Sequence, residues 1–262
     1  MLATLLTDWR LGLDGDADGA LLPVTTDDGT RATLRLDANE HEHLALQRWR
    51  GRGAVQLLRA DPSRHALLVE RVGGDLADAW DVEACQTVAT LYGVLHVAPM
   101  PQLRSQADLV GQRADELRRD ARSVPVPRRL VDQALALARD LTADPPTAVL
   151  HGDLHFGQVR RGSRDGEDVW LAIAPRPVNG DPHSELEPML RHRFDEYAAP
   201  WAAGSVRDGI RQRFHTLVDT AGLDEDRARD WVVVRSVLHA HRVQHDRDQV
   251  TACITVAKAV QD

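Results

Sequence analysis

The sequence predicts an α+β fold with a small sheet-rich N-terminal part and a larger, mainly helical C-terminal part. Strand-like apolar runs fill residues 21–72, and apolar residues take helical spacing after residue 74. A short β-like segment near residue 150 interrupts the helical part. With 262 residues, 43% of them hydrophobic and 27% charged, the chain can bury a sizeable core as one large domain or two packed lobes.

The first domain, residues 1–74, is predicted to hold a small antiparallel sheet and one helix. The dipeptide at residues 28–29 is Asp-Gly, which suits a tight hairpin because glycine accepts positive φ. Residues 39–53 have helical spacing that stops at two glycines. Residues 54–61 and 65–72 predict two further strands.

The second domain, residues 75–262, is predicted to be mainly helical. "TAVLHGDLH" and "DVWLAIAP" are β-like segments around the turn "RGSRDGED", so we expect a hairpin at residues 148–182 within this domain. Helical spacing covers residues 81–97, 105–121, 126–142 and 183–262, with breaks near Gly204 and Gly222.

Composition argues against several classes of protein. A net charge of −8 does not suit a nucleic-acid-binding surface, and no apolar run approaches the roughly 20 residues that span a bilayer. The first 20 residues lack the pattern of a secretory signal, so we expect a cytoplasmic protein. Cys85 and Cys253 have no metal-ligand spacing and are expected to be buried as small hydrophobic residues.

Residues 150–159 read "LHGDLHFGQV", which resembles the "HGDLHxxN" catalytic loop of the aminoglycoside phosphotransferase-like kinases. "RWRGRGAVQLLRADPSRHALLVERV", "LHVAPMP" and "WLAIAPRPVNGDPHSELEPMLRHRFDE" narrow the resemblance to the streptomycin 6-kinase (aminoglycoside/hydroxyurea antibiotic resistance kinase) family. The likeness runs from about residue 18 to about residue 245. It implies a protein-kinase-like fold of two lobes and phosphoryl transfer to an alcohol group.

By this resemblance, Asp153 is the catalytic carboxylate that accepts the hydroxyl proton, and His151 and His155 support its loop. The alternative is that Asp153 only caps a turn. In the N-terminal lobe the family's phosphate-binding lysine falls at Arg35, and Glu42 matches the residue that pairs with it. A solvated glutamate on a helix face is the alternative for Glu42.

Two weaker indications concern the nucleotide. The connector from Glu70 through Val72 to Gly74 could present backbone groups to an adenine edge. Gly15 and Gly19 could let the backbone approach phosphates. Asp14, Asp16 and Asp18 lie among them, however, and favour a plain acidic loop.

Three functional positions depart from the family pattern. Gln158 replaces the metal-binding asparagine, with a side chain one methylene longer. Ala174 replaces the metal-binding aspartate of "W-L-x-I-D-P", and a methyl group cannot coordinate Mg²⁺. Arg35 replaces lysine, and Lys258, the only lysine, is far along the chain. An engineered substitution would explain Ala174 but neither of the others.

Two further groups of residues are candidates for ligand binding. An acidic series could bind a cationic aminocyclitol or amine, replace a metal ligand, or form a solvated helix face. Its members are Asp181, Glu185, Glu187, Asp195 and Glu196. His239, His241 and His245 have partial zinc-ligand spacing, but no third ligand motif accompanies them, which favours ordinary surface or capped histidines.

The sequence therefore supports two functions. The first is a pseudokinase or repurposed protein that needs no cofactor. It binds a small polar or cationic molecule through Asp181, Glu185 and Glu187, uses Asp153 as a general base in chemistry that needs no nucleotide, or scaffolds a protein partner. The second is an active kinase that uses ATP to phosphorylate a hydroxyl group of an aminoglycoside-like compound. It would recruit Mg²⁺ through Gln158, Asp181 or Glu187. The substitutions at Arg35, Gln158 and Ala174 favour the first.

Overall fold

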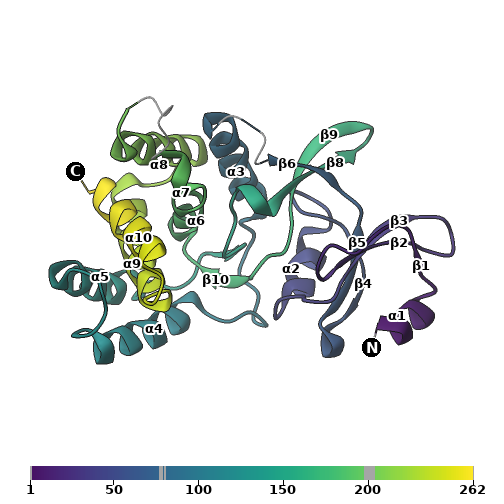
Figure 1. Ribbon diagram of the computed structural model, residues 1–262, viewed down its shortest axis with the longest axis horizontal. Helices are drawn as coiled ribbons and strands as arrows, with labels where there is room; N and C mark the ends of the chain where they lie inside the picture. Colours follow the sequence, from purple (N-terminus) through teal and green to yellow (C-terminus); the bar gives the residue numbers. More distant parts are fainter. Residues whose placement is uncertain (1, 77–78, 80, 198–203, 262) are drawn as a thin grey trace. The chain divides into compact units, whose positions relative to one another are not determined.

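The computed structural model describes residues 2–76, 79, 81–197 and 204–261, which form two compact units. The first unit comprises Met1–Asp78 and Gly157–Pro177, and the second comprises Ala79–Phe156 and Val178–Asp262. Residues 157–177, placed by the sequence in the helical domain, thus group with the sheet-rich part. The expected α+β division into an antiparallel-sheet part and a helical part is confirmed (Figure 1).

The sheet of the first unit has five antiparallel strands in the order β1-β2-β3-β5-β4. Gly29 has a φ of +85° in the turn between β2 and β3, as the Asp-Gly dipeptide predicts. The strands are β1 (Gly12–Leu13), β2 (Leu21–Thr25), β3 (Arg31–Arg35), β4 (Leu57–Asp61) and β5 (Ala66–Glu70), with the 3₁₀ helix η1 (Pro62–Arg64) between the last two.

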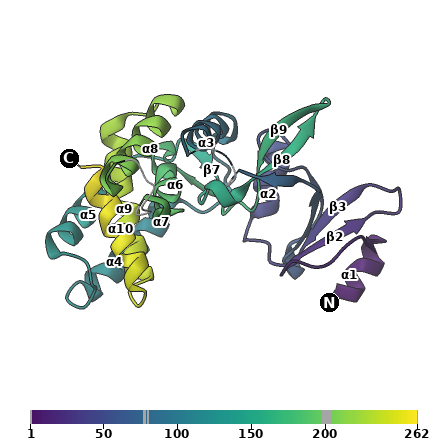
Figure 2. The same cartoon turned by 45° about the horizontal axis from the view of Figure 1, so that its top comes forward.

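Two helices accompany this sheet. Helix α1 (Leu2–Trp9), which the sequence analysis missed, lies beside β2 and β3 (Figure 2). Its Leu2, Leu6 and Trp9 pack against the buried residues of these strands. Helix α2 (Glu42–Trp49) matches the expected helix and contacts β4. The core under α1 is formed by Leu11, Leu22, Val24, Ala32, Leu34 and Leu68.

A second sheet in this unit corrects the expected hairpin. Strands β8 (Val159–Arg164) and β9 (Glu167–Ala172) pair around Asp165 and Gly166, which both have positive φ, and β6 (Gly73–Asp75) pairs with β8. The segment at residues 148–150 is not part of that hairpin. It forms β7 (Ala148–Leu150), which pairs with β10 (Val178–Gly180) in the helical unit.

The helical unit surrounds β7 and β10. Helix α3 packs on α8, and α9 packs on α5 and α10. Gly222 ends α8 in the left-handed conformation, as its position predicts. The helices are α3 (Asp81–Leu95), α4 (Gln106–Asp120), α5 (Arg128–Leu141), α6 (Glu187–Arg191), α7 (Phe194–Tyr197), α8 (Val206–Ala221), α9 (Glu225–Arg242) and α10 (Arg247–Ala259), with the 3₁₀ segments η3 (Phe156–Gln158) and η4 (Pro182–Leu186).

Cys85 and Cys253 are free and buried, as expected. Burial raises the pKa of each thiol to about 12. Within the described part of the chain, no helix combines the length and hydrophobicity needed to cross a membrane.

Candidate functional site

The "HGD" turn at residues 151–153 directly follows β7. Gly152 has a φ of +85°, which favours glycine and lets the chain turn sharply after the buried strand. His151 is fully buried, whereas the side chain of Asp153 is 17% exposed. Of the two residues predicted to be catalytic, His151 is therefore closed off from solvent and Asp153 is accessible to it.

Glu185 in η4 holds this turn through its backbone. Its carboxylate accepts the N–H groups of His151 at 3.1 Å and Gly152 at 2.5 Å. Its Oε2 also lies 3.2 Å from His96 Nε2. Burial opposes ionisation, but the hydrogen bond and charge of His96 outweigh it and lower the pKa of Glu185 below its ordinary value of 4.5.

This placement corrects the expectation that Glu185 binds substrate. The residue has no exposed surface, and its backbone carbonyl also accepts the Tyr92 hydroxyl at 2.8 Å. A carboxylate covered on all sides does not contact a ligand from solvent. Glu185 is therefore a positioning residue for the turn that carries Asp153.

Glu187, the first residue of α6, is also turned inward. It is 2% exposed, accepts Arg191 Nε at 2.9 Å, and lies 3.9 Å from Arg235 Nε. Burial opposes its ionisation, but the charges of Arg191 and Arg235 lower the pKa of Glu187. Glu187 was predicted to contact substrate, but in the structure it neutralises two partly buried arginines.

Arg235 and Arg191 connect this carboxylate to the turn. Arg235 donates to the carbonyl oxygens of Ser184 at 2.8 Å and Gly152 at 2.9 Å. Arg191 Nη2 lies 3.8 Å from Asp153 Oδ1. Asp153 is thus held beside a guanidinium group whose charge Glu187 already balances.

Two histidines complete the surroundings of Asp153. The rings of His155 and His192 are stacked, with centroids 3.5 Å apart and planes within 5° of parallel. Burial and then the charge of Arg191 lower the pKa of His192. Side-chain nitrogen or oxygen atoms of Asp153, His155 and His192 all lie within 4.8 Å of one another.

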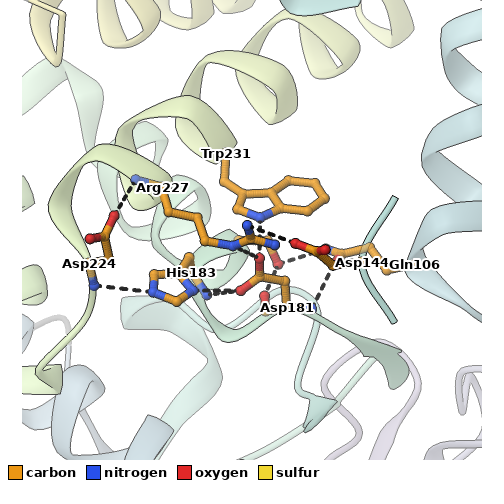
Figure 3. A network of polar contacts seen from close by, with 8 residues as sticks. Gln106, Asp144, Asp181, His183, Asp224, Arg227 and Trp231 are labelled. Carbon is orange, nitrogen blue, oxygen red and sulfur yellow. Dashed lines mark hydrogen bonds and ion pairs between the residues drawn. The ribbon is translucent and has the colours of Figure 1, made fainter. Parts of the chain in front are cut away.

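Asp181 is the centre of a separate polar network (Figure 3). Its Oδ1 accepts the His183 N–H at 3.0 Å, and its Oδ2 accepts Arg227 Nε at 2.5 Å and Trp231 Nε1 at 2.7 Å. Burial opposes ionisation, but these donors hold the pKa of Asp181 far below its ordinary value. Arg227 also pairs with Asp144 at 3.1 Å.

A cavity of about 360 Å³ lies beside this network. It is lined by Asp181, Arg227 and Trp231 and includes Thr147 and Gly180. Those last two residues lie at the opposite end of the β7–β10 pair from His151. Asp181 therefore belongs to a different place in the unit from the "HGD" turn, and its contact with substrate stays a prediction.

In the sheet-rich unit, Arg35 and Glu42 form the ion pair that the sequence predicts. The side chain of Glu42 is 1% exposed, so it is not on a solvated helix face. Arg35 Nη2 also lies 3.3 Å from Asp37 Oδ1. Its positive charge is thus shared between two carboxylates of the same unit.

Ala174 lies two residues after the end of β9, in a left-handed backbone conformation with a φ of +52°. The Asn39 side-chain amide donates to the carbonyl oxygens of Ala174 at 3.4 Å and Pro175 at 3.2 Å. Asn39 also donates to Glu42. The turn is therefore tied to the residue that holds Arg35. Gln158 joins the same region, since its carbonyl accepts the Ile173 N–H at 2.9 Å.

Glu70 and Val72, the predicted adenine-side residues, lie at the end of β5 and just after it. The carboxylate of Glu70 pairs with Arg164 at 2.5 and 2.9 Å. Val72 is half-buried, near Gly162. That the backbone groups of these residues bind the edge of an adenine stays a prediction.

The remaining candidates have ordinary surroundings. Asp14 pairs with Arg71 at 2.7 Å, and Glu196 on α7 pairs with Arg193 at 2.5 Å, while Asp195 is exposed. His241 Nε2 lies 2.9 Å from Asp120 Oδ2. Among the residues that the structure describes, His239, His241 and His245 do not form a three-ligand group.

Sequence reasoning missed the partners that surround the predicted residues. No sequence motif marks Arg191, His192 or Arg235. Their role depends on the contact of α6 and α9 with the "HGD" turn, which only the folded chain forms. Asn39 was likewise missed, although it lies three residues before Glu42, just outside α2. The "LRHRF" run that holds Arg191 and His192 is visible in the sequence and is the one available signal.

Comparisons with known proteins agree with these features. The profile of the family described as aminoglycoside/hydroxyurea antibiotic resistance kinase matches residues 13–247. A streptomycin 6-kinase of Streptomyces glaucescens is 34% identical, with 100% of this chain and 88% of that protein covered. A hydroxyurea phosphotransferase of Kitasatospora aureofaciens is also 34% identical, with 90% and 70% covered.

Solved structures of lower identity share the fold. An aminoglycoside phosphotransferase of Streptomyces rimosus, solved with ADP and streptomycin, has a TM-score of 0.55 at 19% identity, covering 89% of this chain and 96% of that one. The choline kinase LicA of Streptococcus pneumoniae has a TM-score of 0.58 at 10% identity, covering 98% and 96%. The expected protein-kinase-like fold is thereby confirmed.

Proposed function

Because the chain belongs to the aminoglycoside/hydroxyurea antibiotic resistance kinase family, we propose that it keeps that family's small-molecule site but has lost ordinary Mg²⁺- and ATP-dependent phosphoryl transfer. The main support for this proposal is the alanine at position 174. It stands where the family pattern has aspartate, in a turn that Asn39 fixes through two carbonyl groups.

The residues at this position do not fit the metal that the family implies. Mg²⁺ takes oxygen ligands in near-octahedral geometry. Ala174 offers a methyl group, and its carbonyl oxygen already accepts Asn39. Loss of one electrostatic group of this kind typically costs about 10²–10³ in rate.

The phosphate-binding position supports the same proposal. Arg35 pairs with Glu42 and lies near Asp37, so its charge is balanced within its own unit. A planar guanidinium also differs in shape and reach from the compact ammonium group of lysine. The pair with Glu42 is part of the family pattern, so it is the nearby Asp37 and the changed shape of the cation that are expected to weaken binding of a nucleoside triphosphate.

The ligand in this proposal is a small polar or cationic molecule with hydroxyl groups. Asp153 keeps its place at the "HGD" turn, and Glu185 and Arg235 hold the backbone of that turn. A hydroxyl group can donate to such a carboxylate without a metal ion or a nucleotide. A protein partner remains the alternative occupant in a pseudokinase.

A second candidate, an active phosphotransferase that acts on an alcohol group with ATP and Mg²⁺, is favoured by this same turn. The "HGD" residues of the family pattern are all present at residues 151–153, and proteins that are 34% identical are named as a streptomycin 6-kinase and a hydroxyurea phosphotransferase. In that case Gln158 would have to hold the metal together with a carboxylate from elsewhere in the chain, because Ala174 has none.

Restoration of the family residues separates the two candidates. Phosphoryl transfer from ATP to streptomycin is measured for the unchanged chain and for the triple variant Ala174→Asp, Gln158→Asn, Arg35→Lys. We expect background transfer from the unchanged chain and a gain of at least about 100-fold from the variant. The same variant with Asp153→Asn is the control and should fall back to background. Rapid transfer by the unchanged chain would establish the second candidate.

A further inference from the structure

We propose that Asp153, His155 and His192 form a binding site for a borderline divalent cation such as Zn²⁺ or Co²⁺. Two imidazoles and one carboxylate are a ligand set that such ions accept, whereas Mg²⁺ prefers oxygen ligands alone. The site shares no residue with positions 158 and 174, where the family pattern has its metal ligands. It lies wholly within the helical unit.

The three side chains lie almost close enough together to bind one ion. Their ligand atoms lie within 4.8 Å of one another. Ligands about 2.1 Å from a tetrahedral ion are about 3.4 Å apart, so each atom has to move by roughly an ångström. The stacked rings of His155 and His192 must also tilt so that both nitrogen lone pairs point to one ion.

Both segments that carry these ligands are held by buried contacts. Glu185 fixes the turn before His155 through the backbone of His151 and Gly152. His192 caps the C-terminus of α6, and its carbonyl oxygen accepts Nη1 of the buried Arg213 at 3.0 Å. Ligands carried by fixed backbone segments need only side-chain rotation to bind an ion.

The same Arg213 links the two segments directly. Its guanidinium lies 5.0 Å from the ring centroid of Phe156, the residue after His155. Arg193, the residue after His192, lies over the same ring at 4.7 Å. Each of the two histidines therefore directly precedes a residue of one shared packed cluster.

The local charges predict competition for the site. Asp153 and Glu187 carry negative charge, and Arg191 and Arg235 balance it. Because Arg191 is 3.8 Å from Asp153, a bound cation has to displace its guanidinium from that carboxylate. Removal of the Arg191 charge should therefore strengthen binding, whereas removal of a ligand should weaken it.

The test uses the full chain without an affinity tag. Co²⁺ is titrated while its visible d–d absorption is recorded, and Zn²⁺ and Mg²⁺ are titrated by calorimetry. We expect one Co²⁺ or Zn²⁺ per chain and no saturable Mg²⁺ binding to the same site. His192→Ala and Asp153→Asn should each weaken Co²⁺ binding by at least about 100-fold, since loss of outer-shell partners alone costs about 10–100-fold. His245→Ala, an exposed histidine outside the site, is the matched control.

Arg191→Gln supplies the opposite change and should tighten Co²⁺ binding by about tenfold, because it removes a positive charge 3.8 Å from Asp153. Circular dichroism establishes whether each variant is folded. If Arg191→Gln is not folded, His192→Ala and Asp153→Asn alone test the proposal. Absence of one-to-one Co²⁺ binding to the unchanged chain would overturn the proposal. So would equal affinity of the unchanged chain, His192→Ala and Asp153→Asn.

Discussion

At the scale of single residues, Ala174 combines two unusual features. Its side chain lacks the oxygen that the family pattern has at this position, and its backbone is left-handed with a φ of +52°. Left-handed backbone costs an alanine about 1–2 kcal/mol, whereas glycine adopts it freely and aspartate tolerates it better. The turn thus keeps a shape that suits aspartate after the carboxylate is gone.

This strain predicts that Ala174→Gly stabilises the chain by about 0.5–1 kcal/mol, because relief of strain exceeds the greater freedom of glycine in the unfolded chain. Urea unfolding measures the change. Ala172→Gly is the matched control, since Ala172 is buried in β9 outside the left-handed region, and it should destabilise. Equal loss of stability in both variants would contradict strain at residue 174.

Glu185 gives a second prediction at this scale. Its pKa is lower in the folded chain than its ordinary value of 4.5, so it contributes stability above that pH. This contribution is lost as pH falls through the folded pKa. Glu185→Gln should therefore cost about 3 kcal/mol at pH 7, and the difference from the unchanged chain should shrink below pH 4.5. A difference that stays constant from pH 7 to pH 3 would rule out the ionised carboxylate as the cause.

At the scale of elements, Asp181 joins η4 to α9. It caps η4 through the His183 N–H and accepts two side-chain donors from α9, Arg227 and Trp231. Asp144 reaches the same arginine from the segment before β7, but its side chain is 63% exposed. The two carboxylates around Arg227 should therefore contribute very differently to stability.

Asp181→Ala is expected to cost about 3 kcal/mol, because it leaves the Trp231 N–H without its acceptor, leaves Arg227 with only the exposed Asp144, and removes the cap of η4. Asp144→Ala is expected to cost less than about 1 kcal/mol, as is usual for an exposed ion pair. Thermal or urea unfolding of the two variants measures both. Comparable losses would show that the network is not organised around Asp181.

Also at this scale, the sequence predicts strands and helices where local patterns are strong. The hairpin at Gly29 and the helix end at Gly222 follow from residues that accept positive φ. The pairing of residues 148–150 with β10 could not be predicted in this way, because "TAVL" and "DVWLA" are equally strand-like and only tertiary packing selects the partner. Helix α1 was missed because it has only eight residues, so its helical spacing rests on Leu2, Leu5, Leu6 and Trp9 alone.

At the scale of the whole molecule, the motifs predicted the family and the fold, which the comparisons confirm. They also predicted the Arg35–Glu42 pair. They could not predict that Glu185 and Glu187 are buried, because acidic residues in a row read equally as a solvated face or a binding site. Burial depends on His96, Arg191 and Arg235, which come from elements distant in the sequence.

The central claim is that the substitutions at residues 35, 158 and 174 have removed Mg²⁺-dependent use of ATP. Calorimetric titration of the unchanged chain with ATP, in the presence of Mg²⁺ and in its absence, tests this claim most directly. We predict that Mg²⁺ changes the Kd for ATP by less than about threefold, which is less than 1 kcal/mol. Tightening by tenfold or more in the presence of Mg²⁺ would contradict the claim.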